Sequence, residues 1–324
     1  MIRIYPPLRA IAMTCVVAIV AASCSSSTVT TAPTGAPTAA PTAASTVVNL
    51  ATPSGAITAV ATVPDSALVT PGTLTVCQSV PSVPFLMFDA NGNVIGTDAD
   101  TAAQIAARLG LKEASVLSVF ATMITAVQTG KCDVIVSSMD VRADREAQID
   151  QIGYLVTQAG LLFQYGETHG IGDPTKDPLS LCGHKIAAEI GSEGLDQITT
   201  WSKGCTAAGK QGITSVSVQS NDVLYQLLIT GQVDAAIGGP EPANWYAMQH
   251  PNTIQSGATY QLILEGIGVK KGSTALENAI IAALNSMKAD GTLLAIMTKY
   301  GSNALGIPTS FTLNPTGEPV LGGG

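Results

Sequence analysis

Residues 129–138 read TGKCDVIVSS, and residues 230–239 read TGQVDAAIGG. Each segment turns on a glycine, Gly130 or Gly231, and runs through an aspartate into a short apolar strand. Self-similarity at a fixed distance indicates that one supersecondary unit is used twice. Because the repeat is single and long, it favours two similar α/β lobes over a solenoid; a chance match is the alternative. Two facing lobes enclose a cleft, and clefts between domains are where small ligands bind.

The length and charge of the chain limit what it can be. Its 324 residues allow about two domains at ~150 residues each. The formal net charge is −8, and no basic run is visible. Nucleic acid is therefore not an expected partner, because phosphate contacts need clustered Lys and Arg.

The N-terminus has the pattern of a signal peptide, over residues 1–23. Its apolar stretch, residues 10–20, is too short to span a bilayer. It ends in AASC, which resembles a bacterial lipobox in which Cys24 becomes the acylated first residue. Ala21 stands where Leu is more usual, and cleavage nearby with release of a soluble protein is the alternative. We expect an extracytoplasmic protein, lipid-anchored to the outer face of the bacterial cell membrane.

The segments that flank the folded part are rich in residues that do not build a core. Residues 24–69 are dominated by Ser, Thr, Ala and Pro, which cannot bury enough apolar surface to offset their ordering entropy. We expect them to form a flexible linker from the lipid anchor, with folding beginning near Gly72. The Gly/Pro/Thr-rich residues 305–324 are predicted to be a disordered tail.

Export changes how the cysteines are interpreted. Four remain after processing and acylation, and in an oxidising compartment they indicate two disulfides with three possible connectivities. A Cys182–Cys205 bond would close a loop around one strand–helix unit, leaving Cys77 to pair with Cys132 in the first lobe. Metal binding is the competing interpretation. It is not expected, because no pair has CxxC spacing and the three histidines lie far apart.

The rest of the chain alternates short apolar strands with amphipathic helices, which predicts parallel sheets in both lobes. Besides the two repeat strands, strands are predicted at residues 73–77, 85–88, 116–119, 160–164, 185–189, 215–218 and 261–270. Helices are predicted at residues 121–129, 142–148, 222–230 and 293–300, with others opening at Asp100, Ser192 and Thr274. Thr274 and Glu277 have the spacing of a capping box.

Several longer runs resemble a known family. These are residues 72–85, DANGNVIGTDADTAAQIAARLGLK, FATMITAVQTGKCDVIVSSMDVRADR and ALNSMKADGTLLAIMTKYG. Over roughly residues 70–302 the chain is similar to the family 3 extracellular solute-binding proteins, the polar amino acid receptors of ABC importers.

The resemblance implies an α/β type II periplasmic-binding-protein fold. In that fold two parallel-sheet lobes are joined by two crossing strands, with a ligand cleft between them. Lobe 1 would then comprise residues 70–157 plus 267–304, and lobe 2 residues 158–266. The crossings are placed near Thr157 and Gly266.

The resemblance also implies which residues bind the ligand. They include the positions at which proteins of this family bind the carboxylate of their ligand. Arg145 matches the clamping arginine, whose planar fork suits a carboxylate, although a solvated surface arginine is the alternative. Ser192 and Glu193, after Gly191, match a turn whose N–H groups meet the same carboxylate; simple helix capping is the alternative. Phe120 and Phe85 match a stacking aromatic and its Pro-Phe loop, or else belong to the core.

Open parallel sheets bind ligands outside the carboxyl ends of their strands, which adds the ends of both repeats to the predicted site. The departures from the family concern charge. Acids that would hold an α-ammonium are replaced by Ser79 and Gly239, and a loop tyrosine by Ser82. New acids appear, and a buried carboxylate needs a partner such as a cationic ligand group; some of them could instead be exposed. These arguments complete the predicted site with Ser137, Ser138, Asp140, Ser82, Gly239 and Glu241.

The sequence thus predicts a lipid-anchored, monomeric receptor that binds a small polar solute. The expected solute is an amino-acid-like or cationic nitrogen compound, delivered to ABC permease subunits by hinge closure. No cofactor, metal or enzymatic activity is expected. One alternative is an enzyme similar to cyclohexadienyl dehydratases, which needs a positioned acid or base in the cleft. The other is a ligand-sensing surface lipoprotein without a transport role.

Overall fold

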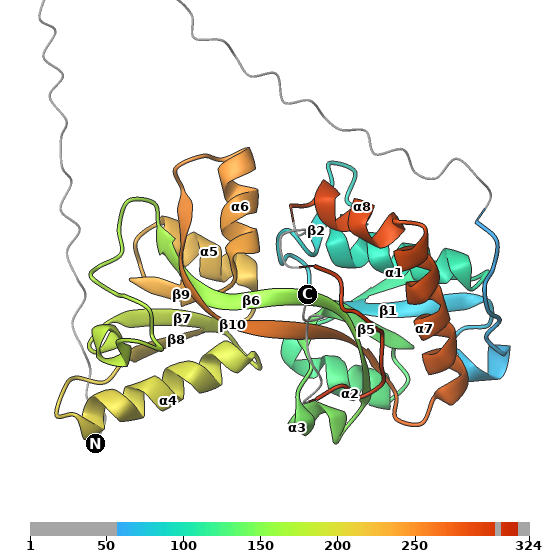
Figure 1. Ribbon diagram of the computed structural model, residues 1–324, viewed down its shortest axis with the longest axis horizontal. Coiled ribbons are helices and arrows are strands. Elements are labelled where there is room, and N and C mark those ends of the chain that lie inside the picture. The colour runs from blue at the N-terminus through green and yellow to red at the C-terminus, as the bar shows by residue number, and fades with distance from the viewer. Residues whose placement is uncertain (1–56, 302–305, 317–324) are drawn as a thin grey trace, which may run out of the picture. The chain divides into compact units, whose positions relative to one another are not determined.

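The computed structural model describes residues 57–301 and 306–316 (Figure 1). The predicted signal peptide, the lipidation site at Cys24 and most of the predicted linker lie outside the described residues. The fold is α/β, and its centre is one eight-stranded sheet in the order β4-β1-β5-β10-β6-β9-β7-β8.

Each lobe contributes three parallel strands to this sheet. In lobe 1 these are β4 (Lys112–Leu117), β1 (Thr73–Gln78) and β5 (Val134–Asp140). In lobe 2 they are β9 (Ala235–Ile237), β7 (Lys185–Glu189) and β8 (Thr214–Val218). β5 and β9 are the two repeat strands, and each lies between β1 or β7 and a crossing strand. The repeated sequence therefore occupies the same position in both lobes. A separate two-stranded sheet pairs β2 (Met87–Phe88) with β3 (Val94–Ile95).

Two long strands, β6 (Asp150–Gln164) and β10 (Ile254–Val269), run through both lobes as an antiparallel pair (Figure 1). Thr157 pairs with Ile263, and Gly266 pairs with Gly153. Both predicted crossing points therefore lie inside these strands. The prediction of parallel sheets holds within each lobe but not at the centre, where β5–β10, β10–β6 and β6–β9 are antiparallel.

Helices cover both faces of each lobe's part of the sheet. In lobe 1, α1 (Thr97–Arg108), α7 (Thr274–Ala289) and α8 (Thr292–Lys299) pack on one face, and α2 (Met123–Gln128) on the other. In lobe 2, α4 (Glu193–Ala207) packs on one face, and α5 (Asn221–Ile229) with α6 (Pro240–Gln249) on the other. The short α3 (Ala143–Glu146) follows β5. Single 3-10 turns form at Asp65–Ala67, Phe120–Thr122 and Pro178–Leu181.

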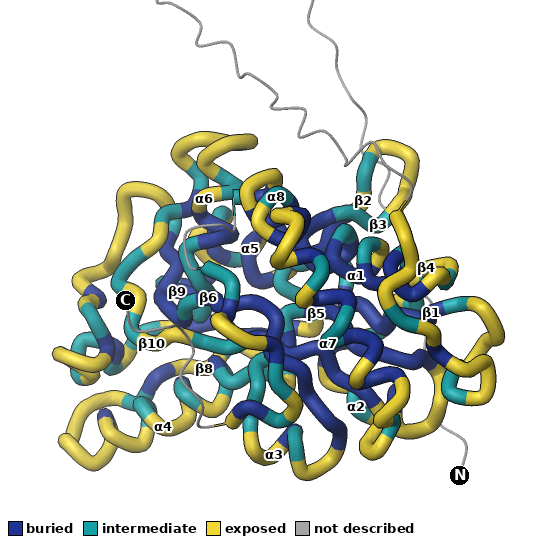
Figure 2. Tube along the Cα trace, turned by 45° about the vertical axis from the view of Figure 1, so that its right-hand side comes forward, coloured by how far each residue is buried: buried dark blue, intermediate teal, exposed yellow. Residues whose placement is uncertain are grey.

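The strands are buried because apolar side chains project from both of their faces. Along β7, Ile186 and Ala188 belong to the core under α4, while Ala187 belongs to the core under α5. Side chains alternate across a strand, so a sheet covered on both faces needs apolar residues at consecutive positions. The buried trace in Figure 2 follows the strands accordingly.

Both predicted disulfides are confirmed. Cys77 at the end of β1 bonds to Cys132 just before β5, with the two Cα atoms 5.8 Å apart. Cys182 bonds to Cys205 in α4 across a Cα–Cα distance of 5.5 Å. Each bond joins neighbouring elements of a single lobe.

Several local predictions were wrong. α6 was not predicted, and α7 has Ser273 at its N-cap without a side-chain capping bond, so the expected Thr274–Glu277 capping box does not form. Part of the predicted disordered tail is ordered: Phe311 is buried in the lobe 1 core and Leu313 bridges to Ile152.

The predicted linker also reaches into the folded part of the chain. The backbone N–H of Val60 bonds to the carbonyl oxygen of Arg108, and Val63 belongs to the lobe 1 core. Folding therefore begins before Gly72.

Within residues 57–301 and 306–316, no single helix has the length and apolar character needed to cross a membrane. Only α7 and α8 taken together meet those criteria, and the pair is bent by 77°.

Candidate functional site

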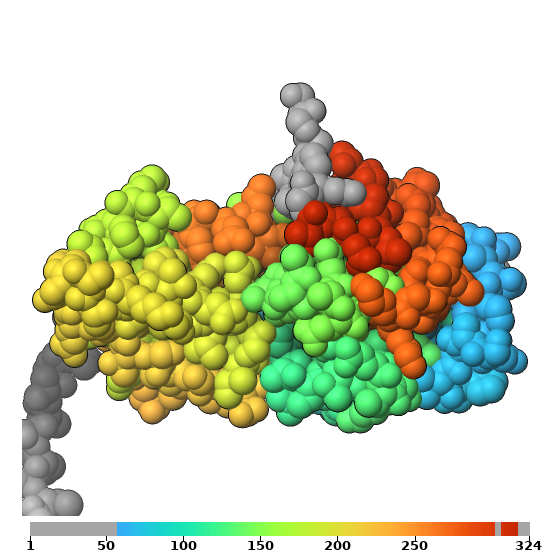
Figure 3. Space-filling model, turned by 90° about the horizontal axis from the view of Figure 1, so that it is seen from below, coloured from blue at the N-terminus to red at the C-terminus, as the bar shows by residue number. Residues whose placement is uncertain are grey.

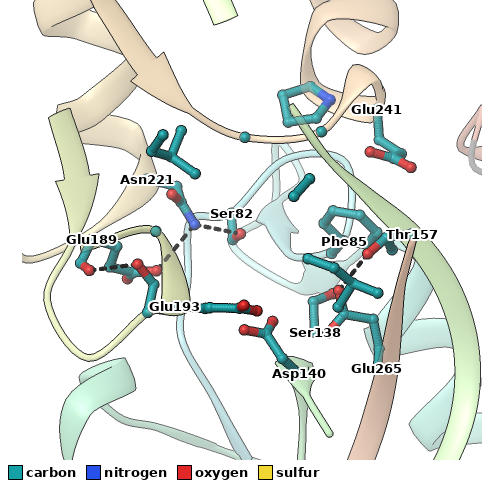
Figure 4. Close-up of a pocket in the computed structure, with 18 of the residues that line it drawn as sticks. Ser82, Phe85, Ser138, Asp140, Thr157, Glu189, Glu193, Asn221, Glu241 and Glu265 are labelled. Atoms are coloured by element: carbon teal, nitrogen blue, oxygen red, sulfur yellow. Dashed lines mark hydrogen bonds between the residues drawn. The ribbon is translucent and has the colours of Figure 1, made fainter. Parts of the chain in front are cut away.

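A cavity of about 140 Å³ lies where the carboxyl ends of the lobe strands meet the two crossing strands (Figure 4). A single water molecule needs roughly 10–15 Å³ on this measure, so the cavity has room for a molecule of amino acid size. Residues of both lobes and of β6 and β10 line it. This is the position in which open α/β sheets bind their ligands.

Ten of the eleven predicted ligand-binding residues line this cavity. They are Ser82, Phe85, Phe120, Ser137, Ser138, Asp140, Ser192, Glu193, Gly239 and Glu241. They come from the end of β5, from the segments that follow β1, β4 and β9, and from the starts of α4 and α6. Their individual roles toward a ligand stay predictions.

Arg145, the eleventh predicted residue, does not line the cavity. Its side chain is buried and used within the protein. Nη1 donates to the backbone oxygen of Asp140 at 2.9 Å, and Nη2 donates to the backbone oxygen of Gly191 at 3.0 Å. The guanidinium also lies over the Phe120 ring, 5.5 Å from its centroid. Both guanidinium ends are therefore held by the protein rather than presented to the cavity.

The cavity is strongly acidic. Five of its lining side chains carry a carboxyl group: Asp140, Glu189, Glu193, Glu241 and Glu265. Within the described part of the chain, no Lys, Arg or His lines it. Nor is any group of three or more His, Cys, Asp or Glu arranged there to hold a metal ion. The charge facing the cavity therefore suits an organic cation.

Neighbouring charges act on two of the carboxyl groups, Asp140 and Glu265. Burial raises the pKa of Asp140, the Arg145 charge opposes this, and the Glu193 charge adds to it. The carboxylates of Asp140 and Glu193 face each other in Figure 4. Burial and the Asp140 charge raise the pKa of Glu265. Its Oε1 accepts a 2.6 Å bond from Thr157, whereas its buried Oε2 has no protein partner.

Glu241 forms a second acidic centre. It is only 4% exposed, and its Oε1 has no protein partner. Burial raises its pKa to about 7. A Cβ on Gly239 would lie 2.2 Å from Glu241 Oε2 and 2.4 Å from the Gln158 backbone oxygen. The glycine at a position where the family resemblance implies an acid thus leaves room for the Glu241 carboxylate.

Glu189 belongs to a polar bridge across the cavity. Asn221 Nδ2 donates to Glu189 Oε2 at 3.1 Å and to the Ser82 hydroxyl at 3.0 Å, linking lobe 2 to the β1–β2 loop of lobe 1. Burial, with an added effect of the Asp140 charge, raises the pKa of Glu189 to about 7, although the Asn221 bond opposes the shift.

The buried carboxyl group of Asp98, which does not line the cavity, holds the end of β5 in place. The Ser138 hydroxyl donates to Asp98 at 2.9 Å, and the Tyr154 hydroxyl donates to the other oxygen. Burial raises the pKa of Asp98 to about 6. Ser138 has φ 42°, a left-handed conformation that is costly for a residue with a Cβ. The bond to Asp98 holds the strand end in this conformation at the cavity wall.

Two further contacts join the lobes beside the cavity. Nη1 and Nη2 of Arg142 each lie 3.2 Å from Asp196 Oδ2 in α4. A Cβ built on Gly191 would lie 3.2 Å from Ala121 Cβ, and Gly191 has φ 84°. Figure 3 shows α4, in yellow, against the green α3 region. The approach of the lobes therefore depends on a glycine at position 191.

Residues 74–303 match the sequence model of a protein family, the bacterial extracellular solute-binding proteins, family 3. The chain belongs to this family. Among relatives of this family 3 protein, the arginine-binding protein ArgT of Corynebacterium glutamicum is 28% identical over 237 residues, 72% of this chain and 76% of the relative. The lysine/arginine/ornithine-binding periplasmic protein of Escherichia coli is 24% identical, covering 71% of this chain and 88% of the relative.

Solved structures agree with the type II periplasmic-binding fold. An ancestral arginine-binding protein bound to arginine matches with a TM-score of 0.64 and 29% identity, over 71% of this chain and 98% of that chain. An ancestral amino acid-binding protein, described as a precursor of cyclohexadienyl dehydratase, has a TM-score of 0.61 and 23% identity, over 71% and 95% of the two chains. At that identity the second likeness concerns the fold of this family 3 protein alone.

The sequence did not reveal two of the five acidic residues. Glu189 ends a correctly predicted strand, so the strand-end rule contained the signal for it. Glu265 lies within β10, and nothing in its local sequence distinguishes the cavity side of that strand from the other. Asn221, which holds Glu189, is the first residue of α5 and was not among the predicted site residues.

Proposed function

We propose that this protein binds a small cationic nitrogen compound between its lobes and delivers it to an ABC importer. The observation that carries the proposal is the cavity lining, which among the described residues holds five carboxyl groups and no basic side chain; only Asp140 has a basic partner behind the lining, Arg145, whose Nη1 lies 3.7 Å from Asp140 Oδ2. A cation would neutralise groups whose burial otherwise favours their protonated forms. The aromatic rings of Phe85, Phe120 and Tyr225 also line the cavity and suit a cationic guest.

Hinge closure is part of the proposal. Two crossing strands connect the lobes, and the contacts of Arg142 and Asn221 that span them would form as the lobes approach. A ligand that touches both lobes stabilises the closed state by its extra contacts there. A permease can then distinguish the closed receptor from the open one.

Lipid anchoring at Cys24 is proposed from the AASC sequence at the end of the predicted signal peptide. Labelling of cells with an azide-bearing fatty acid should mark the wild-type protein but not a Cys24→Ser variant. Equal labelling of both would contradict acylation at this residue.

Calorimetric titration of the purified mature protein tests the binding proposal. The panel comprises basic amino acids, polyamines, betaines and guanidino compounds, with acidic amino acids as the matched negative set. We expect binding only among the cations. Binding of acidic amino acids in preference to cations would contradict the proposal.

The cavity charge argues against the enzyme alternative. Prephenate carries two carboxylates, and burying them beside five carboxyl groups without a lining basic residue would be strongly unfavourable. Incubation with prephenate or arogenate, followed by detection of the aromatic product, tests this directly.

A further inference from the structure

We propose that the solute of this protein carries two positively charged groups and no carboxylate, as a diamine, a polyamine or a decarboxylated guanidino amine does. This inference rests on the proposed function and narrows it. It concerns which groups of a ligand the cavity can accept.

The first step is that a ligand carboxylate would have no cation to meet. The family resemblance implies that Arg145 binds the ligand carboxylate, but Arg145 is only 4% exposed and does not line the cavity. Both ends of its guanidinium already donate to the backbone oxygens of Asp140 and Gly191, and its face lies over Phe120. Releasing it would break the bond to the Gly191 carbonyl oxygen and leave the Asp140 carbonyl oxygen with Gln151 Nε2 as its side-chain donor.

The second step concerns the helix N-termini, the other usual carboxylate sites. At α4, the Ser192 N–H and hydroxyl both donate to the Glu189 carbonyl oxygen, at 3.2 and 2.8 Å. Glu193 then adds a carboxylate to the first turn. At α6, Pro240 at the first position has no N–H, and Glu241 follows it. Both termini thus present acids of their own to the cavity, where a ligand carboxylate would be repelled.

The third step is that the negative charge has two centres. The carboxylates of Asp140 and Glu193 face each other in Figure 4, and the Asp140 charge acts on Glu265, whereas the carboxylate of Glu241 lies apart from that of Asp140. One unpartnered, buried oxygen belongs to each centre, Glu265 Oε2 in the first and Glu241 Oε1 in the second. Buried acceptors without donors are rare, and each can accept a hydrogen bond from an ammonium or guanidinium group of the solute.

Matched ligand pairs test the missing carboxylate. Each pair differs only by that group: agmatine and arginine, cadaverine and lysine, putrescine and ornithine. We expect the decarboxylated member of at least one pair to bind about tenfold or more tightly than its amino acid, since a buried unpaired charge is avoided. Tighter or equal binding of the amino acid in every pair that binds would overturn the inference while leaving the proposed function intact. If no cation binds, the proposed function fails, and the inference with it.

An Arg145→Ala variant gives a second readout. If Arg145 clamps a carboxylate, the variant weakens arginine far more than agmatine. We expect an equal loss for both, because the residue acts on Asp140 and Gly191 rather than on the ligand. A selective loss of arginine binding would overturn the inference.

The second charge centre is tested with Glu241→Gln. Cadaverine should bind about tenfold or more weakly to this variant, because a charge-assisted bond is lost, whereas the monoamine pentylamine should change by about threefold at most. Glu277→Gln is the matched control. Glu277 is a buried glutamate of α7 with an unpartnered Oε1, and it lies outside the cavity lining. Equal losses for cadaverine and pentylamine would overturn the two-charge assignment.

Discussion

At the residue scale, the site depends on the pairing of Gly239 with Glu241. The carboxylate occupies space that any side chain at position 239 would need. The two substitutions relative to the family resemblance are therefore linked, since the buried acid at 241 requires the glycine at 239.

Gly239→Ala should weaken cation binding and lower the free energy of unfolding by roughly 1–3 kcal/mol, the usual range for overpacking. The added Cβ must displace either Glu241 or the β6 backbone at Gln158. Titration calorimetry and chemical denaturation measure the two effects.

Gly204→Ala in α4 is the control, because a Cβ there meets nothing within 4 Å. It should raise stability by up to about 1 kcal/mol through helix propensity. If Gly239→Ala binds cations as tightly as the wild type, the prediction is wrong and the cavity tolerates a shift of Glu241.

The stability of the ligand-free protein should fall as pH rises from about 4.5 to 7. The pKa of Glu189 and of Glu241 is raised to about 7, so the folded state holds protons that the unfolded state has lost across this window. More protons bound in the folded state means that stability decreases with pH, by about 1.4 kcal/mol for each unit of pKa shift. Acids with a lowered pKa, such as Asp150 and Asp234, act only below about 4.

Thermal unfolding across this range measures the slope, and a Glu189→Gln/Glu241→Gln double variant should reduce it. The raised pKa values of Asp98, Asp140 and Glu265 account for the slope that remains. Cation affinity should show the opposite trend and improve as pH rises toward 7, because binding favours the charged carboxylates. A wild-type stability that increases from pH 5 to 7 would contradict the assignment.

Sequence reasoning placed ten of its predicted site residues in the cavity lining. The strand-end rule supplied the ends of the two repeats, and the family resemblance supplied residues such as Phe85, Phe120 and Ser192. Sequence reasoning did not foresee that Arg145 lies outside the cavity lining, because a resemblance gives the position of a residue but not the partners of its side chain. Asp140 and Gly191 offer backbone oxygens that no motif encodes.

At the element scale, the disulfides hold neighbouring elements together within each lobe. Removing the Cys77–Cys132 bond, as a Cys77→Ala/Cys132→Ala variant, should lower the free energy of unfolding by about 4 kcal/mol from chain entropy over its separation of 55 residues. The same change at Cys182 and Cys205, 23 residues apart, should cost about 3 kcal/mol.

Denaturant titrations of the two double variants measure this order. A larger loss at the lobe 2 bond would contradict the loop-length argument. Cation affinity serves as a check that the site survives, because none of the four cysteines lines the cavity.

Helices and short strands were predictable as elements because their apolar periodicity is local. The crossing strands were not: β6 was predicted at residues 160–164 but begins at Asp150, since polar residues interrupt its pattern. Asp150 accepts bonds from Gly272 and Asn314, partners far away in sequence. α6, which was not predicted, begins at Pro240, because proline is compatible with the first turn of a helix.

At the scale of the whole molecule, the Arg142–Asp196 pair spans the lobes and favours their approach. Asp196→Asn should weaken cation binding by up to about fivefold, because an exposed ion pair is worth at most ~1 kcal/mol. Asp144→Asn is the matched control. It removes the other carboxylate that bonds to Arg142, but from within lobe 1. Fluorescence energy transfer between labels on the two lobes should report fewer closed molecules only for Asp196→Asn; equal shifts would contradict a role in closure.

The division into two lobes could be predicted from sequence because the repeat marks each lobe once. How the lobes contact each other could not be predicted from the sequence. The contact depends on pairs such as Asn221 with Ser82, which lie 139 positions apart and belong to no common pattern.

Lobe 2 is one uninterrupted piece of chain inserted between β6 and β10, whereas both ends of the described chain pack on lobe 1. It supplies Glu189, Glu193 and Glu241, while Asp140 and Glu265 come from β5 and β10. With this arrangement, lobe 2 could be exchanged as a single unit. Exchanging it for that of another receptor with the same crossing strands would alter only two chain junctions, and would redesign half of the recognition surface in one step.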